Sequence, residues 1–534
     1  MGLVKNWGEA PEKQEEMQMK KRILALLLVL VMIVGMLPTV ALAADEAEPV
    51  EVVDGAQTEQ VEPPDATEDP ETEPEPEVTG EPSEDNVPAA TKLDAISEQA
   101  ADGGEITVYA DDAPTQDADG FYQIGSKEDL IWFRNEVNTK TANKGTSKLS
   151  AKLTANIDLS AETTWEPIGK MSDTYSNYVA FGGTFDGNGF SIKLKIDTDK
   201  PYQALFGYVK SGKIKNLTVE GSVQSSDSTK GYTAGIVAYG NPVEIENCTN
   251  AAAVTATKKG YAAGVAAYAY TNSQIINCAN TGAVTGCGSY VGGITGSASG
   301  TSIQNCKNYG SIQNTGTTAS AVTSVGGIAG SFSGSTTAKM ERCGNFGEIN
   351  SKLKRTGGVS GTLGGGAIIS CFNAGDVTGV YAIGGVVGSV SSSNLQIQNC
   401  YNLGNVTCTD PNASFSDSAA KGVGGILGDM AYSSSSAEVV NCYNAGKVTN
   451  NATTPADIVV GSVVGTSAGK NFSGNAVPGL ITATNCYYLS GTALAGDGAN
   501  ASATGITSKT EAELKADDMP GKLGGSYIAQ KDGY

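Results

Sequence analysis

The residues that most often carry out chemistry in proteins are either missing from this chain or placed where catalysis is not favoured. Histidine is absent from the 534 residues. A triad with a histidine base, a zinc or haem held by imidazole and a zincin helix are therefore excluded. The chain has four arginines, Arg22, Arg134, Arg342 and Arg355, and a net charge of −22. An acidic chain repels polyanions, so nucleic acid is not expected as a partner.

Carboxylates do not form the pairs that glycoside hydrolysis uses, which face one groove about 5–10 Å apart. The acidic residues of the central region occur singly and are predicted to face solvent; they are Glu220, Glu244, Glu246, Glu341, Glu348, Asp376 and Glu438. The one mixed cluster, Arg342 and Arg355 with Glu341 and Glu348, is interpreted as charged side chains that face solvent and not as a catalytic site. The sequence thus predicts no catalytic residue, no metal ligands and no cofactor, and it leaves the ligand-binding residues unknown.

Two further groups of residues have a structural and a functional interpretation. Asp186-Gly187-Asn188-Gly189 resembles a fragment of a calcium loop but lacks its remaining carboxylates, so a tight turn is favoured over a cation site. Several tyrosines lie close together in the early repeats. A tyrosine base for a lyase stays open, but rings stacked along the surface, or a platform for a sugar ring, explain them better; they are Tyr261, Tyr268, Tyr270 and Tyr290.

The elements that must position these residues come from a repeat. A ten-residue unit begins at residues 214, 245, 275, 303, 340, 368, 397 and 439, and a worn ninth copy surrounds Cys486. A second block lies between the units, as GGITG (292–296), GGIAG (326–330), GGVSG (357–361), GGVVG (384–388) and GGILG (424–428). Alternating β-branched residues without helical periodicity predict short strands. Repeats of this length predict an all-β parallel β-helix of about nine coils with one continuous core.

Stacking explains which residue types recur. An asparagine recurs in the units and can form a column in which side-chain amides bond from coil to coil; its positions are 250, 280, 308, 345, 373, 402 and 444. The glycine of each N-x-G is expected to adopt a positive φ where the coil turns; its positions are 221, 282, 310, 347, 375, 404 and 446.

Eight of the ten cysteines occupy the fourth position of successive units, where the first unit has Leu217. Stacked residues point the same way about 4.8 Å apart, whereas a disulfide needs converging Cβ atoms about 3.8 Å apart. We therefore expect a buried column of free thiols that behave as small apolar side chains. Cys287 and Cys408 lie outside the column and are predicted to be unpaired.

The N-terminal region has the features of an exported protein. Residues 1–43 contain a basic start, an apolar stretch that is short for a membrane span and Ala41-Leu42-Ala43, which together predict a cleaved signal peptide and no stable membrane span afterwards. Residues 44–100 hold 19 acidic residues and one lysine. This composition predicts a disordered, extended linker over 44–110, either as a stalk or as a solubilising segment.

The blocks GGITG, GGIAG and GGILG, joined to N-C-Y-N-x-G, resemble the GLUG-motif repeats of bacterial surface proteins. Trp165–Gly169, Phe181–Phe190 and Leu205–Val209 extend the resemblance over about residues 120–534. It implies a right-handed β-helix on an exported protein, cell-surface or secreted, of a Gram-positive type of bacterium. Some relatives carry IgA-cleaving metallopeptidase domains, but that activity needs a zinc held by histidine and does not transfer here.

Caps are expected at both ends, because an open coil presents an unpaired edge. Ser126 and Asp129, followed by Leu130, Trp132, Phe133 and Val137, predict a capped helix within an N-terminal capping region, residues 111–200. The repeats span 201–490, and 491–534 form a C-terminal cap, with a short helix near 509–516, or the start of a truncated segment.

The expected function is a non-enzymatic, exported protein with an adhesin-like role, which binds or displays an extracellular glycan or a surface protein. Two alternatives stay open: a passive spacer module of a larger surface protein, and a polysaccharide-active lyase or hydrolase. Insertions lengthen some coils at 313–325, 407–423 and 449–460, which in solenoids often marks a binding face.

Overall fold

The computed structural model describes residues 113–525, apart from 140–144, 163–164, 172–176, 228–230, 259, 289, 317–322, 410–420, 433–434, 453–457, 466–468, 471–475, 478–480 and 493–504. The predicted signal peptide and the whole of the predicted acidic linker lie outside these residues, as do the central parts of the three insertions. No helix in the described part of the chain has the length and apolar character needed to cross a membrane.

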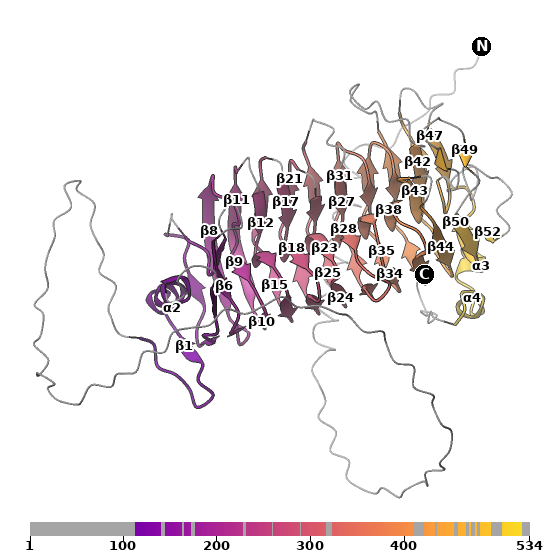
Figure 1. Cartoon of the computed structure of the whole chain (residues 1–534). Helices are drawn as coiled ribbons and strands as arrows, with labels where there is room; N and C mark the ends of the chain where they lie inside the picture. Colours follow the sequence, from indigo (N-terminus) through magenta and orange to yellow (C-terminus); the bar gives the residue numbers. More distant parts are fainter. Residues whose placement is uncertain are drawn as a thin grey trace, which may run out of the picture. The chain divides into compact units, whose positions relative to one another are not determined.

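Parallel strands stack coil upon coil, which confirms the predicted β-helix (Figure 1). Four sheets, numbered here in the order in which each coil visits them, run along the stack. The first sheet has twelve strands: β1 (Tyr122–Ile124), β3 (Ala151–Leu153), β7 (Thr184–Asp186), β10 (Gly212–Lys215), β14 (Val243–Glu246), β19 (Gln274–Ile276), β24 (Ser302–Gln304), β29 (Lys339–Glu341), β34 (Ala367–Ile369), β39 (Leu395–Gln398), β44 (Ala437–Val440) and β50 (Ile481–Thr484).

The second sheet begins with single strands and continues with two short strands in each coil. Its strands are β4 (Ile157–Asp158), β8 (Ser191–Thr198), β11 (Thr218–Ser225), β15 (Thr249–Asn250), β16 (Ala253–Ala256), β20 (Ala279–Asn280), β21 (Val284–Gly286), β25 (Lys307–Asn308), β26 (Ile312–Asn314), β30 (Gly344–Asn345), β31 (Ile349–Ser351), β35 (Phe372–Asn373), β36 (Val377–Gly379), β40 (Tyr401–Asn402), β41 (Val406–Cys408), β45 (Tyr443–Asn444), β46 (Val448–Asn450), β51 (Cys486–Leu489) and β52 (Ile506–Lys509).

The third and fourth sheets complete each coil. The third consists of β12 (Gly231–Ala234), β17 (Gly260–Ala263), β22 (Tyr290–Gly292), β27 (Ser324–Gly326), β32 (Thr356–Gly357), β37 (Ile383–Gly384), β42 (Lys421–Gly424) and β47 (Ile458–Gly461). The fourth consists of β2 (Gly145–Ser147), β6 (Tyr178–Phe181), β9 (Phe206–Val209), β13 (Val237–Gly240), β18 (Ala266–Tyr270), β23 (Thr295–Ser299), β28 (Ala329–Ser333), β33 (Ser360–Leu363), β38 (Val387–Val390) and β43 (Leu427–Met430), with β5 (Lys170–Met171) antiparallel to β6. A separate antiparallel pair is β48 (Gly469–Lys470) and β49 (Ala476–Val477).

Register follows the repeat, whatever the length of the insertions. Ile303 pairs with Met340 although 37 residues separate the two units, because the extra residues lie between the second and third sheets. The nine units supply the nine first-sheet strands from β10 to β50. In the region predicted as an N-terminal cap, β7 and β8 pair in parallel with the repeat strands β10 and β11, and β3 pairs in parallel with β7. That region therefore contains coils of the solenoid as well as a helix.

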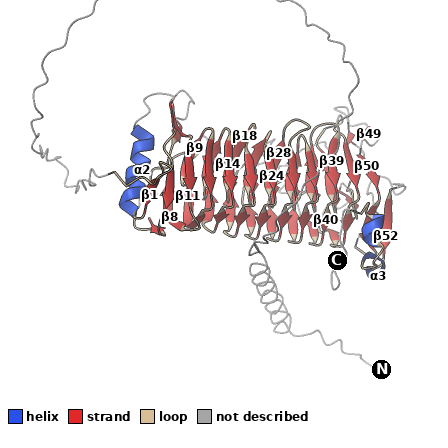
Figure 2. Cartoon of the chain, turned by 90° about the horizontal axis from the view of Figure 1, so that it is seen from below, coloured by secondary structure: helices blue, strands red, loops and turns tan. Residues whose placement is uncertain are grey.

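Helices lie at both ends of the stack, and none of the described residues between 201 and 490 is helical (Figure 2). Helix α2 (Lys127–Thr139) has the predicted capping box: the Asp129 N–H donates to Ser126 Oγ at 3.1 Å, and the Ser126 N–H donates to Asp129 Oδ2 at 2.9 Å. Phe133 is buried between the helix and the first coils, with its ring centroid 6.2 Å from Phe181 and 6.0 Å from Phe185.

The C-terminal end carries two short helices, of which the sequence predicted the first. Helix α3 (Glu511–Leu514) has a capping box between Thr510 and Glu513, and helix α4 (Met519–Lys522) follows it. Leu514, Met519 and Leu523 are buried in one cluster with Tyr443 of the eighth unit. Apolar side chains of these helices therefore pack on the last coils.

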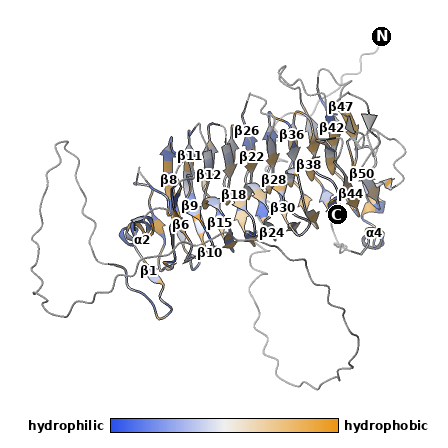
Figure 3. Ribbon diagram, viewed as in Figure 1, coloured by the Kyte–Doolittle hydropathy of each residue, from blue (hydrophilic) through white to orange (hydrophobic). Residues whose placement is uncertain are grey.

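Two apolar strips run along the inside of the stack. The sequence had predicted a single continuous core. The larger strip lies between the first, second and fourth sheets and includes the first residue of each unit, such as Ile275 and Ile368. The smaller strip joins the last residue of each unit to the third sheet, as Val284 and Val291 do. Hydrophobic residues recur on the strands of successive coils (Figure 3). A polar column separates the two strips.

That polar column is the predicted asparagine ladder, and it is confirmed. Each side-chain amide donates to the amide oxygen of the next coil at 2.7–2.8 Å, from Asn250 through to Asn444, and all seven residues are fully buried. The same nitrogen also donates to the carbonyl two residues ahead, as from Asn345 to Gly347 at 2.8 Å. The ladder ends where Asn444 donates to the Ser462 carbonyl at 2.9 Å.

The ladder also explains why the two motif blocks alternate along the chain. The second glycine of each Gly-Gly block lies directly against an asparagine of the ladder. A Cβ on Gly327 would stand 2.3 Å from Asn345 Cγ, and one on Gly358 would stand 2.3 Å from Asn373 Cγ. Because a real Cβ cannot approach so closely, glycine is required there by the neighbouring ladder.

The glycines of the N-x-G motif were predicted to have positive φ, and this is wrong for six of the seven. Gly221 alone has it, at 92°. The others are needed because successive coils approach closely: a Cβ on Gly310 would stand 2.0 Å from the Gly282 carbonyl oxygen. The positive φ falls instead on the residue before each column cysteine, for example 54° at Asn277 and at Asn305. Asparagine tolerates this conformation better than most residues do.

These corner asparagines form a second, outer ladder that the sequence analysis missed. Asn277 donates to Asn247 at 3.1 Å, and Asn305 donates to Asn277 at 3.0 Å. Arg342 takes the place of the next asparagine and donates to Asn305 at 2.8 Å. The Asn-Cys pair of the repeat thus combines a corner residue with a core residue.

The predicted cysteine column is confirmed. All eight members are buried, and none forms a disulfide. Each thiol lies near backbone carbonyls of its own coil and the preceding one, as Cys306 Sγ does at 3.3 Å from Gln304 O and 3.4 Å from Ile275 O. Burial raises the pKa of Cys306 and Cys371, which keeps these thiols protonated. Outside the column, Cys287 is half-buried and free, and Cys408 is buried with its sulfur 2.7 Å from Val380 O.

Replacing Cys306 by serine should destabilise the protein by about 1–3 kcal/mol. The carbonyls that a thiol reaches are too distant for a hydroxyl, which prefers about 2.7–2.8 Å. Cys287→Ser, outside the column and half-buried, is the matched control and should cost much less. Unfolding by denaturant gives both values. The same transition with and without reductant should coincide, and a large drop in stability with reductant would indicate disulfides.

Candidate functional site

A seam where the third and fourth sheets meet gathers side chains on the outside of the stack. On the third sheet, Tyr232, Tyr261 and Tyr290 occupy equivalent positions of successive strands, with Tyr202 preceding them. On the fourth sheet, the equivalent positions are Tyr208, Tyr239 and Tyr268. The chain bends sharply at glycines such as Gly235 between the two strands, which brings the two columns together. We call this surface the tyrosine seam.

The tyrosine rings stack on one another along the seam. The Tyr232 and Tyr261 centroids are 4.6 Å apart with planes at 11°, and those of Tyr261 and Tyr290 are 4.9 Å apart at 24°. Across the seam, Tyr232 meets Tyr239 edge to face at 5.5 Å. Lateral stacking, one of the two structural interpretations, is confirmed. Since these rings cover each other's faces, they leave little room for a sugar to stack, although Tyr270 at the margin is 39% exposed.

The tyrosines are also poorly suited to act as bases. Burial, with a smaller contribution from Tyr178, raises the pKa of Tyr208 to about 12, and burial raises the pKa of Tyr290. A tyrosinate is therefore rarer here at neutral pH than in water. The tyrosine-base alternative loses support from these positions.

Beyond Tyr268 and Tyr290 the seam changes from aromatic to polar. On the fourth sheet, the column continues as Ser297, Ser331, Thr362, Ser389 and finally Asp429. On the third sheet, Tyr290 is followed by Ser324 and then by Arg355, whose carbonyl accepts from the Val325 N–H. The two columns touch where the Ser324 and Thr362 hydroxyls are 2.6 Å apart.

Asp429 is the buried carboxylate of this polar end. It is 4% exposed, and its Oδ1 has no hydrogen-bond partner among the described residues. Burial raises the pKa of Asp429 to about 7, against the opposing influence of the Ser389 hydroxyl, Arg355, the Gly422 N–H and Lys354. The sequence analysis placed the carboxylates singly on solvated positions and overlooked this one. The missed signal was an aspartate in a repeat column that otherwise holds Ser or Thr.

Asp429→Asn should make the protein more stable at pH 8 by a few kcal/mol and leave it almost unchanged near pH 4. The folded-state pKa lies above the unfolded value of about 3.9, so the wild type loses stability as pH rises from about 4 to about 7. An asparagine does not ionise and avoids that loss. Thermal unfolding across this range, with the exposed Asp119→Asn as control, measures the difference. An equal pH profile for wild type and Asp429→Asn would contradict the assignment.

The other predicted groups are dispersed. Asp186–Gly189 form the expected turn, with the Asn188 N–H bonded to Asp186 Oδ1 at 2.9 Å and the Lys215 ammonium 3.1 Å from Asp186 Oδ2. Arg342 lies 3.7 Å from Glu341 on the first-sheet side, whereas Arg355 is in the seam, so the predicted four-residue cluster does not exist. In the described part of the chain no three His, Cys, Asp or Glu side chains gather as metal ligands do.

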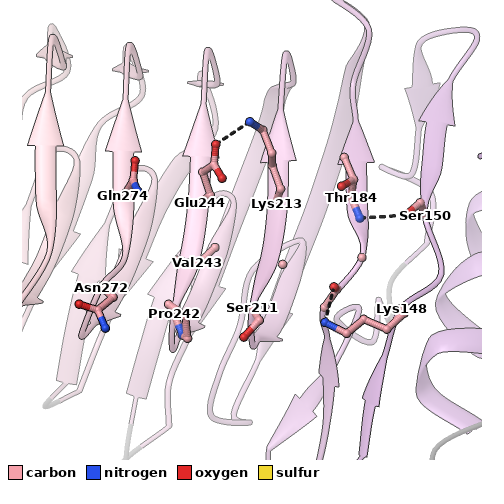
Figure 4. A pocket seen from close by; sticks show the side chains of 13 residues that line it. Lys148, Ser150, Thr184, Ser211, Lys213, Pro242, Val243, Glu244, Asn272 and Gln274 are labelled. Carbon is pink, nitrogen blue, oxygen red and sulfur yellow. Dashed lines mark hydrogen bonds and ion pairs between the residues drawn. The ribbon is translucent and has the colours of Figure 1, made fainter. Parts of the chain in front are cut away.

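Two hollows lie elsewhere on the early coils. An open, polar hollow of about 430 Å³ crosses the first-sheet strands and includes Lys148, Lys213, Glu244 and Asn272 (Figure 4). Lys213 bridges Glu244 at 2.5 Å and Glu246 at 2.8 Å, and these carboxylates raise the pKa of Lys213. Its charge is thus already neutralised, which leaves this hollow little capacity to attract an anion.

The second hollow, of about 410 Å³, lies at the N-terminal end of the seam. Trp165, Met171 and Tyr202 supply its apolar part, and Lys200 and Asp197 lie among its polar residues. The Arg134 guanidinium stands 5.0 Å from the centre of the Trp165 ring. The seam therefore runs from this mixed hollow, over the tyrosines, to the polar end at Asp429.

Comparison with known proteins gives a likeness to solved structures. No family model matches the chain, and no curated protein matches it. Among solved structures, it is similar to a protein described as a putative immunoglobulin A1 protease from Bacteroides ovatus. The two share 18% sequence identity, with a TM-score of 0.36, over 78% of this chain and 92% of the other. The fold assignment made here, a parallel β-helix, rests on the strand pairing described above.

Proposed function

We propose that this chain is an exported, non-enzymatic surface protein of the GLUG-repeat type, whose β-helix binds an extracellular glycan or surface protein along the tyrosine seam. One observation carries the proposal. The interior columns of asparagine, cysteine and glycine repeat almost unchanged from coil to coil, whereas the seam changes from Tyr to Ser or Thr and then to Asp429. In repeat proteins a surface that varies along a constant scaffold is where binding is built.

Export and display are supported by the N-terminal sequence. The basic and apolar start with Ala41-Leu42-Ala43 favours secretion, and the acidic, proline-containing linker would hold the folded part away from its attachment point. A bacterial cell surface of the Gram-positive type, or the surrounding medium, fits these features. The two amide ladders make the rod rigid, which also suits the alternative of a passive spacer.

A polysaccharide-active enzyme is the second candidate, and Asp429 is the observation in its favour. A buried carboxyl with a pKa near 7 is the kind of group that transfers protons at neutral pH. Glycoside hydrolysis, however, uses a second carboxyl about 5–10 Å away, and none is among the groups that set the pKa of Asp429. We therefore favour binding without turnover.

The test is a glycan array probed with the secreted chain, with and without calcium, together with an assay for new reducing ends and unsaturated uronates on the glycans that bind. We expect binding without turnover. Tyr432→Ala removes a ring that is 55% exposed and lies near Tyr290 of the seam, whereas Phe346→Ala removes a ring that is 43% exposed and follows β30 of the second sheet. Loss of binding in the first variant and retention in the second would place the site at the seam. Binding to nothing would favour the spacer, and turnover abolished by Asp429→Asn would establish the enzyme.

A further inference from the structure

A row of aromatic rings runs along the outer face of the second sheet. The ring centroids of Tyr309 and Phe346 are 4.9 Å apart with planes at 8°, and those of Phe346 and Phe372 are 5.1 Å apart at 83°. Tyr401 and Tyr443 continue the series, each 5.1 Å from the preceding ring. We call these five rings the aromatic row. It lies on the wall opposite the tyrosine seam, because the second sheet carries the ladder asparagines that the glycines of the seam wall touch.

Helices α3 and α4 cover only the C-terminal end of the aromatic row. Tyr443 is buried beneath their apolar side chains, and Tyr401 packs partly against the same cluster. Phe346, further along the row, is 43% exposed and is one of three large apolar side chains exposed in the described part of the chain. The covered end shows that the row accepts apolar groups, and the open part has the character of a surface that binds another protein.

The open part of the row has a border of opposite charge on each side. Arg342 lies on the side of the outer asparagine ladder, and its side chain is 56% exposed. Glu348 lies on the other side, two residues beyond Phe346, and is exposed without an ion-pair partner among the described residues. Asp376 holds the position equivalent to Glu348 on the next coil. The aromatic row thus separates a cationic border from a carboxylate border.

We propose that this face binds the same face of a second copy of the chain, as a parallel, in-register pair with a two-fold axis along the stack. Such an axis exchanges the two borders, so Arg342 of each copy faces Glu348 of the other. An antiparallel pair sets each border against itself. Over the coils that α3 and α4 leave open, the carboxylate border would then meet only carboxylates or neutral residues. Charge complementarity therefore selects the parallel pair.

The sizes of the outward side chains agree with this arrangement. The axis sets the fifth position of each unit opposite the seventh, so the Phe372 ring of one copy faces Ala374 of the other. The same exchange brings Lys307 over the Tyr309 ring, a favourable contact between a cation and an aromatic face. On the coils before the row the outward residues are small, as at the exposed Ala283, which lets the two sheets approach.

The face is large enough for a weak pair. The six coils whose first-sheet strands run from β14 to β39 extend about 29 Å along the stack, and the width from Arg342 to Glu348 is about 20 Å. Two such faces bury about 1,150 Å², just below the area of a stable complex. The pair is therefore transient in solution. If both copies are attached to one surface, as proposed above, their high local concentration favours it.

The pair leaves both tyrosine seams open. Because the second sheet forms the wall opposite the seam, the two seams of a pair face away from each other. Pairing therefore goes beyond the binding proposed for a single chain. It would give an assembly with two binding faces, whose avidity for a repeated ligand exceeds the affinity of either face.

Sedimentation velocity of the full chain at physiological salt, which screens its acidic segments, tests the pairing. From about 1 to about 300 µM we expect a monomer–dimer equilibrium with a Kd of about 10–100 µM. Phe346→Ser should weaken the pair about tenfold or more, since it removes an apolar ring at the centre of the contact. Tyr432→Ser, which changes an exposed ring near the seam, is the matched control and should leave the Kd unchanged.

Charge reversal tests the parallel orientation. Arg342→Glu and Glu348→Arg should each abolish pairing alone, because each sets like charges opposite one another at two places. An equimolar mixture of the two variants should pair again, as should a chain that carries both changes. Glu438→Arg, at an exposed position of β44 on the first sheet, reverses the same charge away from the contact and should have no effect. Thermal unfolding of each variant checks that it is folded.

A chain that stays monomeric over the whole range would overturn the inference. So would equal weakening by Phe346→Ser and Tyr432→Ser, or a mixture of the two charge variants that fails to pair. The proposed function is judged separately, by the glycan array and its loss in Tyr432→Ala. A chain that binds a glycan as a monomer keeps that function, and a chain that pairs without a glycan keeps this inference alone.

Discussion

Asn345→Gly should destabilise the protein by about 3–5 kcal/mol, one of the two largest effects expected in this molecule. The substitution removes the acceptor of the Asn308 amide and the donor to Asn373, both at 2.7 Å and both fully buried. Each group left unsatisfied costs about 1–3 kcal/mol, and glycine in a strand adds about 0.5–1 kcal/mol. Denaturant unfolding of the folded body measures the sum.

The outer ladder provides the control for this substitution. Asn277 also bonds to asparagines above and below, but its side chain reaches solvent and its φ is 54°. Glycine accepts that φ without strain, and water replaces the lost bonds. Asn277→Gly should therefore cost less than about 1 kcal/mol. Similar costs at both positions would show that the buried ladder is not what holds the coils together.

Gly327→Ala should destabilise the protein about as much as Asn345→Gly does, although it adds only a methyl group. The new Cβ would lie 2.3 Å from both Asn345 Cγ and the Gly358 carbonyl oxygen, and neither can move without breaking a ladder or a strand pairing. Overpacking in a rigid core typically costs about 1–3 kcal/mol or more, and here a displaced ladder amide would add to it. We expect a loss of about 4 kcal/mol or failure to fold. Gly521→Ala, where no atom lies within 4 Å of the new Cβ, should be neutral or slightly stabilising.

A double substitution separates steric overlap from a general intolerance of alanine at residue 327. Combined with Asn345→Gly, Gly327→Ala should cost clearly less than the sum of the two single changes, because the side chain that it overlaps is gone. Contacting residues typically show coupling of about 0.5–3 kcal/mol. Additive losses would mean that the overlap with the Gly358 carbonyl, and not with the ladder, determines the requirement for glycine.

The fold was predictable because its determinants are local and repeated. The apolar first position, the cysteine and the asparagine of each unit point inwards whatever the insertion length, as the pairing of Ile303 with Met340 shows. The capping box at Ser126 and Asp129 is equally local.

The reason why glycine is required in the N-x-G motif was not predictable. Both a positive φ and a close approach of the neighbouring coil require glycine, and only the stacked structure distinguishes them.

The repeat pattern was enough to predict the coil, its register and its buried columns, since each position repeats with the same chemistry in nearly every unit. The location of the candidate site depends on which coils come together in the folded chain. Tyr232 and Tyr239 meet because the chain turns between β12 and β13, and Arg355 reaches the neighbourhood of Asp429 from two coils away. Whether Asp429 is solvated or buried depends on how closely the third and fourth sheets approach. That distance is set by side chains from several coils at once, so no single stretch of sequence contains it.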